Sequence, residues 1–359
     1  MTDLNGSVSK AIDAQRAILA RKLYERQLSL SNELSKKFRQ LDKDRAMQDF
    51  ESHLAYLSEA IRAGQPLLFL DHIAWLKVLL DGIGVSQEDL RVHLGQTLTV
   101  LRDYLPDKAD AIVTPYIEIA QQQLPTMPLQ VVPFADGSNS QDSQVWNDLA
   151  TAYLQALLEG EREKAKELID KAVHQGAAIK DIYMHVFQRT QYEIGRLWQI
   201  NRISVAQEHY CTAATQLIMS QLYPHIFSVP KNGYRLVATS VGGDLHEMGI
   251  RMVADFFEME GWDTYYLGAS TPTAGIISAI KEWNAHLLAL SATMTYHVTN
   301  ITRVIEAVRA EKSCNNVKII VGGYPFNIAP GLWKNVGADG YARDANEAVI
   351  VGERLQNLL

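Results

Sequence analysis

The segment that decides how the C-terminal part of the chain folds reads Arg235-Leu-Val-Ala-Thr-Ser-Val-Gly-Gly-Asp-Leu-His-Glu-Met-Gly249. Its first seven residues suit a buried β-strand, two glycines end the strand, and an apolar helical pattern begins at Ile250. A strand, loop and helix in this order are typical of a parallel α/β sheet, whose ligands bind at the carboxyl ends of the strands. The loop residues Asp244 and His246 are therefore expected at a ligand-binding edge.

Asp244 precedes His246 by two residues, and this spacing allows two interpretations of the loop. In the first, the carboxylate accepts the N–H of one imidazole nitrogen and leaves the other nitrogen free to bind a metal. In the second, the aspartate caps the following helix and the histidine is solvated. The short motif alone favours the capped helix, so the rest of the chain has to decide.

Residues 229–359 alternate strands with helices and predict an open, doubly wound, flavodoxin-like domain with a five-stranded parallel sheet. The strands are expected at 235–241, 263–267, 286–291, 317–322 and 339–342, and the helices at 247–260, 272–284, 297–312, 328–335 and 344–357. The first, third and fourth strands end in small or hydroxyl-bearing stretches, which are Gly242–His246, Ser291–Thr293 and Gly322–Gly323. Such ends leave a slot along the sheet edge. No G-x-G-x-x-G pattern follows the first strand, which argues against a simple nucleotide domain.

A four-helix bundle is expected before this domain, over residues 143–228. Its helices are predicted at 145–158, 161–174, 178–198 and 204–223, and their short connections favour antiparallel neighbours. Ser204 is a candidate N-cap that places Glu208 and His209 near the same tip of the bundle as Trp198. These three side chains form either one cluster or, separately, a core indole, a carboxylate on a helix dipole and a surface histidine.

Residues 1–124 predict an all-helical domain, followed by a linker at 125–142 that is first proline-rich and then polar. The helices are expected at 8–44, 46–63, 67–82, 86–104 and 107–123. The first carries an apolar stripe spaced alternately by seven and four residues, which consists of Ile12, Leu19, Leu23, Leu30, Leu34 and Leu41. This stripe is buried either within the domain or against a second copy of the chain.

The composition bounds the class of protein. The 359 residues, 47% hydrophobic and 21% charged, are typical of a globular chain with more than one domain. A net charge of −7 disfavours nonspecific binding to nucleic acid or anionic lipid. No apolar run reaches the roughly 18 residues of a membrane helix, and the N-terminus does not resemble a signal segment, so we expect a cytoplasmic protein without membrane contact. Cys211 and Cys314 fall in different elements, so no disulfide is expected.

The sheet edge resembles the cobalamin-binding module of methionine synthase, corrinoid methyl carriers and light-sensing cobalamin regulators. The family pattern is Asp-x-His-x-x-Gly, then Ser-x-Leu, then Gly-Gly. Here it reads Asp244-Leu-His246-Glu-Met-Gly249, then Ser291-Ala-Thr293 with Thr in place of Leu, then Gly322-Gly323. The 41 residues between the first two elements and the 28 between the last two agree with the family's spacing.

This resemblance implies that His246 is the lower axial ligand of cobalt and replaces the cofactor's own dimethylbenzimidazole. Asp244 would accept a hydrogen bond from the other nitrogen of this imidazole. The other residues of the pattern would shape the slot that receives the displaced nucleotide tail, and they are Gly249, Ser291, Thr293, Gly322 and Gly323.

The spacing Trp198, nine residues, Glu208-His209 resembles the signature of the light-sensing cobalamin regulators, in which a helical bundle caps the upper face of the corrin. The resemblance implies that Trp198 covers a 5′-deoxyadenosyl group and that Glu208 binds its ribose. Gln199 stands where some of these regulators carry a second cobalt-binding histidine, for which His185 is a substitute candidate.

The N-terminal domain does not resemble the DNA-binding helix-turn-helix of those regulators. Its segment Phe69–Leu80 is similar to the N-terminal region of photocobilins, cobalamin photoreceptors that also hold a bilin. Because residues 1–124 contain no cysteine, a bilin in this domain would be noncovalent. The other interpretation is a helical output or dimerisation domain.

The resemblance therefore implies a light sensor that binds adenosylcobalamin and signals when light breaks the cobalt–carbon bond. We expect such a protein to be a homo-oligomer with a downstream signalling partner, without direct DNA binding and without enzymatic activity. The alternative is a corrinoid methyl carrier of a cobalamin-dependent methyltransferase system, which has no need of a pocket made by Trp198 and Glu208. A third hypothesis is a binding module whose slot is empty.

Overall fold

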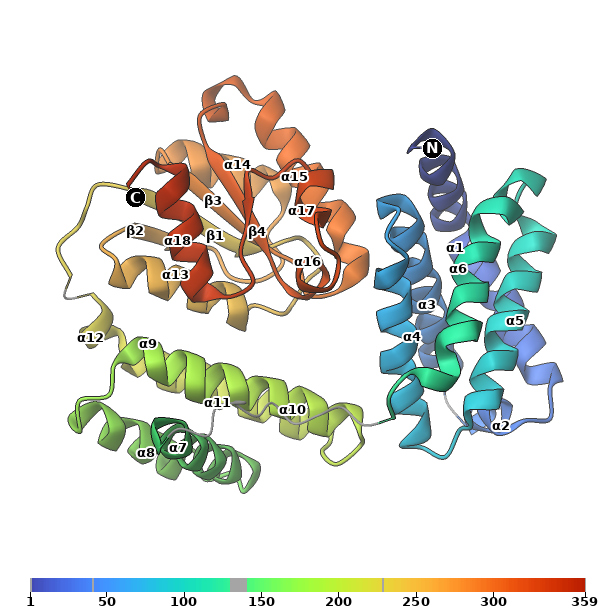
Figure 1. Cartoon of the computed structure of the whole chain (residues 1–359), viewed down its shortest axis with the longest axis horizontal. Helices are drawn as coiled ribbons and strands as arrows, with labels where there is room; N and C mark the ends of the chain where they lie inside the picture. The colour runs from blue at the N-terminus through green and yellow to red at the C-terminus, as the bar shows by residue number, and fades with distance from the viewer. Residues whose placement is uncertain (1, 41, 130–140, 228, 359) are drawn as a thin grey trace.

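The computed structural model describes residues 2–40, 42–129, 141–227 and 229–358 of the chain (Figure 1). An N-terminal group of helices stands beside a sheet that carries helices on both faces, and a second group of helices lies along another side of the sheet layer. This architecture confirms the predicted fold class.

The N-terminal group contains the helices α1 (Thr2–Ser29), α2 (Glu33–Gln40), α3 (Lys43–Ala63), α4 (Pro66–Asp81), α5 (Gln87–Tyr104) and α6 (Asp110–Gln123). The single helix expected at 8–44 is thus two helices, because the Asn32 side chain accepts the N–H of Ser35 at 3.0 Å and starts a new helix. Ile12, Leu19 and Leu23 are fully buried within the chain itself, which favours a plain first helix over a dimerising arm. Leu41 lies outside the described residues.

The second group contains α7 (Gln141–Leu158), α8 (Arg162–His174), α9 (Ile179–Ile182), the π-helical segment η3 (Tyr183–Gln188), α10 (Arg189–Gln199), α11 (Val205–Gln221) and α12 (Tyr223–Ile226). Ser204 caps α11 as predicted, since its Oγ accepts from Gln207 N at 3.2 Å while Gln207 Oε1 accepts from Ser204 N at 3.0 Å. Of the predicted linker, residues 130–140 lie outside the described residues, and α7 begins at its far end.

The sheet consists of β1 (Arg235–Ser240), β2 (Asp263–Tyr266), β3 (Leu287–Ser291), β4 (Lys318–Gly322) and β5 (Gly340–Tyr341), in the order β2-β1-β3-β4-β5 with all pairs parallel. Ser240 is in register with Ser291, and Ser291 with Gly322, so the ends of β1, β3 and β4 are neighbours. The predicted slot edge therefore exists as three adjacent strand ends.

Helices cover both faces of the sheet. One face carries α13 (Met248–Met259) and α18 (Ala345–Leu355), and the other carries α14 (Thr273–Glu282) and α15 (Val298–Ala310). The short helices α16 (Tyr324–Ile328) and α17 (Leu332–Asn335) connect β4 to β5. None of the helices in the described ranges is long and apolar enough to cross a membrane.

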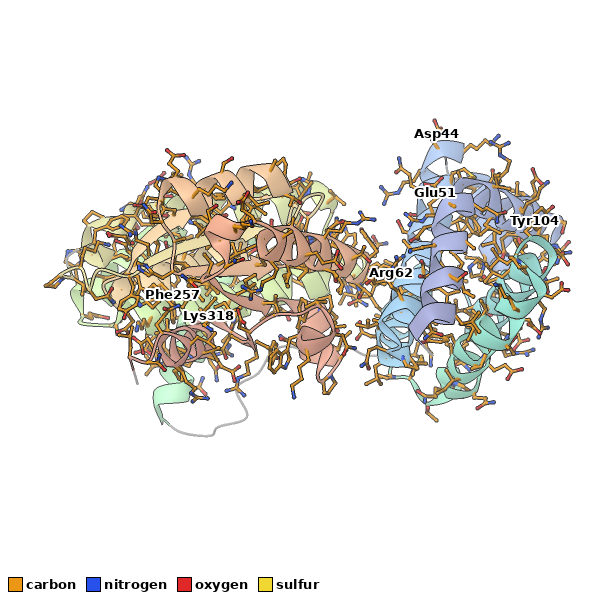
Figure 2. All side chains as sticks on the ribbon, turned by 90° about the horizontal axis from the view of Figure 1, so that it is seen from above. Asp44, Glu51, Arg62, Tyr104, Phe257 and Lys318 are labelled. Carbon is orange, nitrogen blue, oxygen red and sulfur yellow. The ribbon has the colours of Figure 1, made fainter. Side chains whose placement is uncertain are left out.

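The two helical groups pack against different helices of the sheet domain, and they meet each other where Trp198 lies against Trp75. One core cluster contains the N-terminal helices together with the face of α14 and α15, and the other contains the second helical group together with α13 and α18. Phe257 of α13 is fully buried in the second cluster (Figure 2). A Cβ at Gly352 would lie 2.6 Å from Cζ of Phe257, so this glycine lets α18 approach α13 closely.

Candidate functional site

The loop between β1 and α13 is held by hydrogen bonds from two neighbouring segments. Gly243 adopts a φ of +89°, and its N–H donates to Ser270 Oγ at 3.0 Å. Asn300 of α15 donates from Nδ2 to the carbonyl oxygen of Gly242 at 2.8 Å. These two hydrogen bonds therefore fix the position of the loop that carries Asp244 and His246.

Asp244 is the buried centre of this loop, and its side chain has no exposed surface. Oδ1 accepts from His246 N at 3.0 Å and from His246 Nδ1 at 2.8 Å. Oδ2 accepts from Thr293 N at 2.6 Å and from Met294 N at 3.4 Å, and His297 Nδ1 lies 3.2 Å from it. The carboxylate thus connects the end of β1 to the end of β3.

The electrostatics of the pair follow from these contacts. Burial alone would raise the pKa of Asp244, but the hydrogen bonds from His246 and the Thr293 N–H, together with the nearby imidazole of His297, outweigh it and hold this pKa well below its usual range. The hydrogen bond to Asp244 raises the pKa of His246, and the charge of Glu208 acts in the same direction. A permanently ionised Asp244 keeps the proton of the neutral imidazole on Nδ1, so that Nε2 is the nitrogen with a free lone pair.

His246 has the surroundings of a single protein ligand to a metal. Its side chain is 57% exposed, and within the described residues no hydrogen bond is made to Nε2. No group of three or more His, Cys, Asp or Glu side chains in this part of the chain is arranged to hold a bare metal ion. One imidazole suits a metal whose other ligands come from a macrocycle, so the donor set fits cobalt in a corrin ring.

The neighbouring strand ends leave almost no room for side chains. Ser291 is 9% exposed and pairs with Gly322. Gly323 has a φ of +102°, and a Cβ there would lie 2.0 Å from the carbonyl oxygen of Ala292. Glycine at 323 is therefore required by the fold of the edge itself. Gly249, in the first turn of α13, has open space where a Cβ would be.

The predicted residues of the bundle tip contact different parts of the chain. Trp198 lies against Trp75 of the N-terminal helix α4, with ring centroids 6.0 Å apart. Oε2 of Glu208 lies 3.4 Å from Nε2 of His209, whose side chain is 74% exposed. The charge of Glu208 also raises the pKa of His246. The tip of the bundle therefore meets the N-terminal helices through Trp198 and acts on the site loop through the charge of Glu208.

Gln199, which stands in place of a second histidine, and the substitute candidate His185 each have a partner within the chain. Gln199 is buried and donates from Nε2 to the carbonyl oxygen of Trp75 at 3.0 Å, so it fixes the second helical group to α4. His185 stacks on Trp146 at a centroid distance of 5.3 Å.

Sequence reasoning missed several residues that build the site. His297 lies beside Asp244, and Asn300 holds the Gly242 carbonyl. Glu247 accepts from Gln216 of α11 at 2.8 Å and from Tyr266 of β2 at 2.9 Å, which joins the second helical group to the sheet. The signal for His297 and Asn300 was their position within a few residues after Thr293, in the segment that passes the loop of the neighbouring strand.

Comparisons with known proteins show which family the chain resembles. Residues 234–350 match the family model of a B12 binding domain, and residues 149–223 match a second model described in the same words. The chain is 30% identical over 196 residues to dimethylamine corrinoid protein 2 of Methanosarcina acetivorans, covering 54% of this chain and 86% of the relative. It is 34% identical over 121 residues to dimethylamine corrinoid protein 1 of the same organism, covering 33% of this chain and about half, 55%, of that relative.

A solved structure shares the fold. The monomethylamine corrinoid protein of Methanosarcina barkeri superposes with a TM-score of 0.53 at 21% identity, over 58% of this chain and 99% of that one. Neither family match includes residues 1–148.

These relatives correct the predicted function. They are corrinoid proteins named for dimethylamine, so the prediction of an adenosylcobalamin light sensor is wrong. The motif around His246 and the helical bundle do not distinguish the two subfamilies, and the distinction depended on the spacing of Trp198 and Glu208 alone. A cobalamin cofactor with its cobalt is supported, whereas an adenosyl upper ligand and a bilin are not. The chain belongs to the family of cobalamin-binding corrinoid proteins.

Proposed function

We propose that the chain is a corrinoid methyl carrier, which receives a methyl group on protein-bound cobalamin and passes it on with the help of a methyltransferase. The observation that carries the proposal is the relationship to dimethylamine corrinoid protein 2, which extends over 86% of that relative. The buried Asp244 and half-exposed His246, at the edge where three strands end, supply the side chains that such a carrier needs.

In this proposal each part of the site has a defined task. When bound, cobalamin would supply a cobalt centre that can accept and release a methyl group. His246 would hold the cobalt through Nε2, and Asp244 would keep the imidazole in that orientation and adjust its basicity. Ser291, Thr293, Gly322 and Gly323 border the slot for the nucleotide tail. The charge of Glu208, in the second helical group, acts on the imidazole of His246. Gly249 leaves open space at the first turn of α13.

We also propose the division of labour along the chain. Residues 143–228 and 229–359 would form the carrier, joined by the linker 125–142 to a helical domain at 1–124. The partner would be a methyltransferase that supplies the methyl group from a small methylated compound, and the names of the relatives suggest methylated amines as the first class to test.

The test uses the full chain loaded with hydroxocobalamin and reduced with titanium(III) citrate. On addition of [14C]methyl iodide, the carrier should retain label through gel filtration and release it to a small thiol acceptor. The matched control is His246→Ala, which should retain much less label because the cofactor is held less firmly. Cobalamin that binds but takes up no label would refute the carrier function.

A further inference from the structure

The segment Thr293–Asn300, which joins β3 to α15, has two sides with different partners. One side holds the loop that carries the proposed cobalt ligand. Thr293 N donates to Asp244 Oδ2 at 2.6 Å, and Asn300 Nδ2 donates to the carbonyl oxygen of Gly242 at 2.8 Å. Both ends of the segment are therefore hydrogen-bonded to the loop between β1 and α13.

The other side of the segment faces α3 of the N-terminal helices. The ring of Tyr56 meets the ring of Tyr296 edge to face, with centroids 5.2 Å apart, and its hydroxyl lies 3.9 Å from Met294 Sδ. On its far face Tyr56 stacks on His72 at 3.9 Å with an interplanar angle of 7°. Tyr56 is thus clamped between its own helical group and the segment, so its position is well defined.

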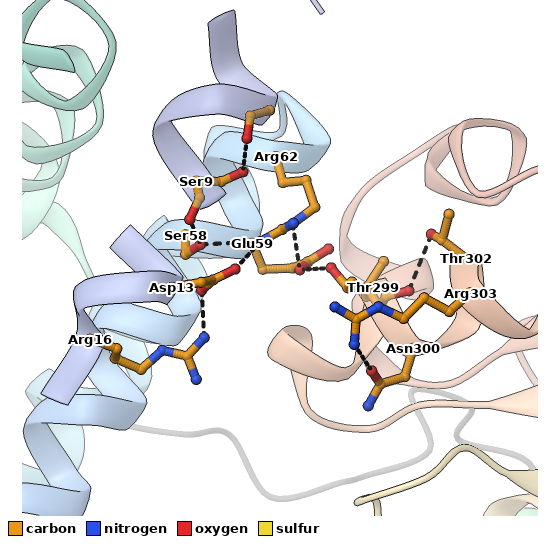
Figure 3. A network of polar contacts seen from close by, with 12 residues as sticks. Ser9, Asp13, Arg16, Ser58, Glu59, Arg62, Thr299, Asn300, Thr302 and Arg303 are labelled. Atoms are coloured by element: carbon orange, nitrogen blue, oxygen red, sulfur yellow. Dashed lines mark hydrogen bonds and ion pairs between the residues drawn. The ribbon is translucent and has the colours of Figure 1, made fainter. Parts of the chain in front are cut away.

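One turn later along α3, Glu59 makes a second contact with the segment. Glu59 is 4% exposed and its Oε2 accepts from the hydroxyl of Thr299 (Figure 3). The same oxygen lies 3.4 Å from Arg62 Nε, and Arg62 also pairs with Asp13 of α1, which in turn pairs with Arg16. The contact across the interface is therefore part of a fixed network of charges and not an isolated surface pair.

Thr299 and Asn300 are consecutive residues with opposite partners. Thr299 binds Glu59 in the N-terminal helices, and Asn300 binds Gly242 in the cobalamin loop. A displacement of α3 would move the first turn of α15 and with it the hydrogen bond to the loop. Likewise Tyr296, which touches Tyr56, is followed by His297, which lies 3.2 Å from Asp244.

We propose that residues 293–300 form a coupling segment through which Tyr56 and Glu59 of α3 position Asp244, and through it His246. Tyr56 and Glu59 are positioning residues, since neither touches the site itself. The inference rests on the proposed role of His246 as the cobalt ligand, but it does not depend on methyl transfer. Because coupling between two sites is reciprocal, binding of cobalamin should also tighten α3 at Tyr56 and Glu59.

The test compares variants of the full chain that differ by a few atoms. Thr299→Val removes the hydroxyl that Glu59 accepts from, and Thr299→Ser keeps it. Thr302→Val is the matched control, because the hydroxyl of Thr302, one turn on, donates to the Val298 carbonyl of its own helix. Tyr56→Ala removes the ring contact with Tyr296, and Tyr56→Phe restores it.

Two quantities are measured for each variant: the dissociation constant for hydroxocobalamin, and the amide hydrogen exchange of residues 293–300 in the cobalamin-free chain. Thr299→Val and Tyr56→Ala should weaken binding about fivefold or more, at the lower end of the usual coupling range, and should speed exchange in the segment. Thr299→Ser, Tyr56→Phe and Thr302→Val should stay near the wild type. In the wild type, cobalamin should slow exchange at residues 56–62.

The outcomes separate this inference from the proposed function. Unchanged affinity and exchange in both Thr299→Val and Tyr56→Ala would overturn the coupling, even in a chain that carries methyl groups. A His246→Ala variant with the wild-type cobalamin spectrum would instead overturn the ligand role of His246, on which the coupling to cobalt depends.

Discussion

Oδ1 of Asp244 lies 2.8 Å from Nδ1 of His246, and the contact joins a fully buried carboxylate to an imidazole that is 57% exposed. The buried partner is held by backbone N–H groups from the end of β3, so the orientation of the exposed ring is set by the sheet and not by solvent. A ligand preorganised in this way loses little conformational entropy when it binds a metal.

The first prediction concerns the charge of Asp244. Asp244→Asn can still accept a hydrogen bond but makes the imidazole a weaker donor to cobalt, so hydroxocobalamin affinity should fall about 10- to 100-fold. Affinity is measured by titration followed by absorbance. Asp339→Asn is the control, since Asp339 also accepts a backbone N–H, that of Ile319, but lies at the opposite end of its strand pair. Equal affinities in Asp244→Asn and the wild type would contradict the role given to this carboxylate.

The sheet and its edge were predictable because a parallel strand, its loop and its helix have a strong local pattern. The strand ends at Ser240, Ser291 and Gly322 follow from that pattern and from the rule that parallel strands end together. The contacts of Trp198 and Gln199 were not predictable, because both side chains meet Trp75, more than a hundred residues earlier in the chain. The break of the first helix at Asn32 was missed because the apolar stripe continues across it.

A second prediction concerns the close approach of β3 and β4. Gly323→Ala places a Cβ 2.0 Å from the carbonyl oxygen of Ala292 and keeps a φ of +102°, so it should cost about 4 kcal/mol or more of unfolding free energy. Gly331→Ala has a φ of +81° but no atom within 4 Å of its Cβ, so it should cost only about 1 to 2 kcal/mol. Urea denaturation of both variants separates steric overlap from backbone strain. Equal losses in the two variants would show that the overlap is relieved.

A third prediction is the pH dependence that Glu59 gives to stability. Burial raises the pKa of Glu59 from 4.5 to about 7, against the hydrogen bond from Thr299 and the charge of Arg62, while Asp13 adds to the rise. Between pH 4.5 and about 7, Glu59 is protonated in the folded chain and ionised in the unfolded chain. Stability therefore falls as the pH rises through this window and is constant above it. Relative to Glu59→Gln, the wild type should lose up to about 3 kcal/mol across this window.

The measurement is the unfolding midpoint of the wild type, Glu59→Gln and Glu51→Gln at about pH 5 and about pH 8. Glu51→Gln is the control on the same helix, where Figure 2 labels Glu51, because the carboxylate that contacts Thr299 is that of Glu59. A wild type with the same pH dependence as Glu59→Gln would contradict the raised pKa of Glu59.

A fourth prediction concerns Trp198, whose ring lies 6.0 Å from that of Trp75. Because the indole joins two parts of the chain, Trp198→Ala should change the ratio of the affinities for methylcobalamin and adenosylcobalamin by less than about threefold, or about 0.7 kcal/mol. Binding of both cobalamins is compared with that of Trp333→Ala, a change at α17. A large selective loss of adenosylcobalamin affinity in Trp198→Ala would contradict the proposed methyl-carrier function.

The central claim is that Nε2 of His246 is the lower ligand of cobalt. It is tested most directly by the electron paramagnetic resonance spectrum of the full chain loaded with cobalamin and reduced to the Co(II) state, with histidine in natural form or labelled with 15N. The nitrogen splitting should change from triplets to doublets on labelling, and His246→Ala should lose the label-dependent pattern. A splitting that stays triplet in the labelled protein would mean that the cofactor's own base binds the cobalt, and would contradict the ligand role of His246.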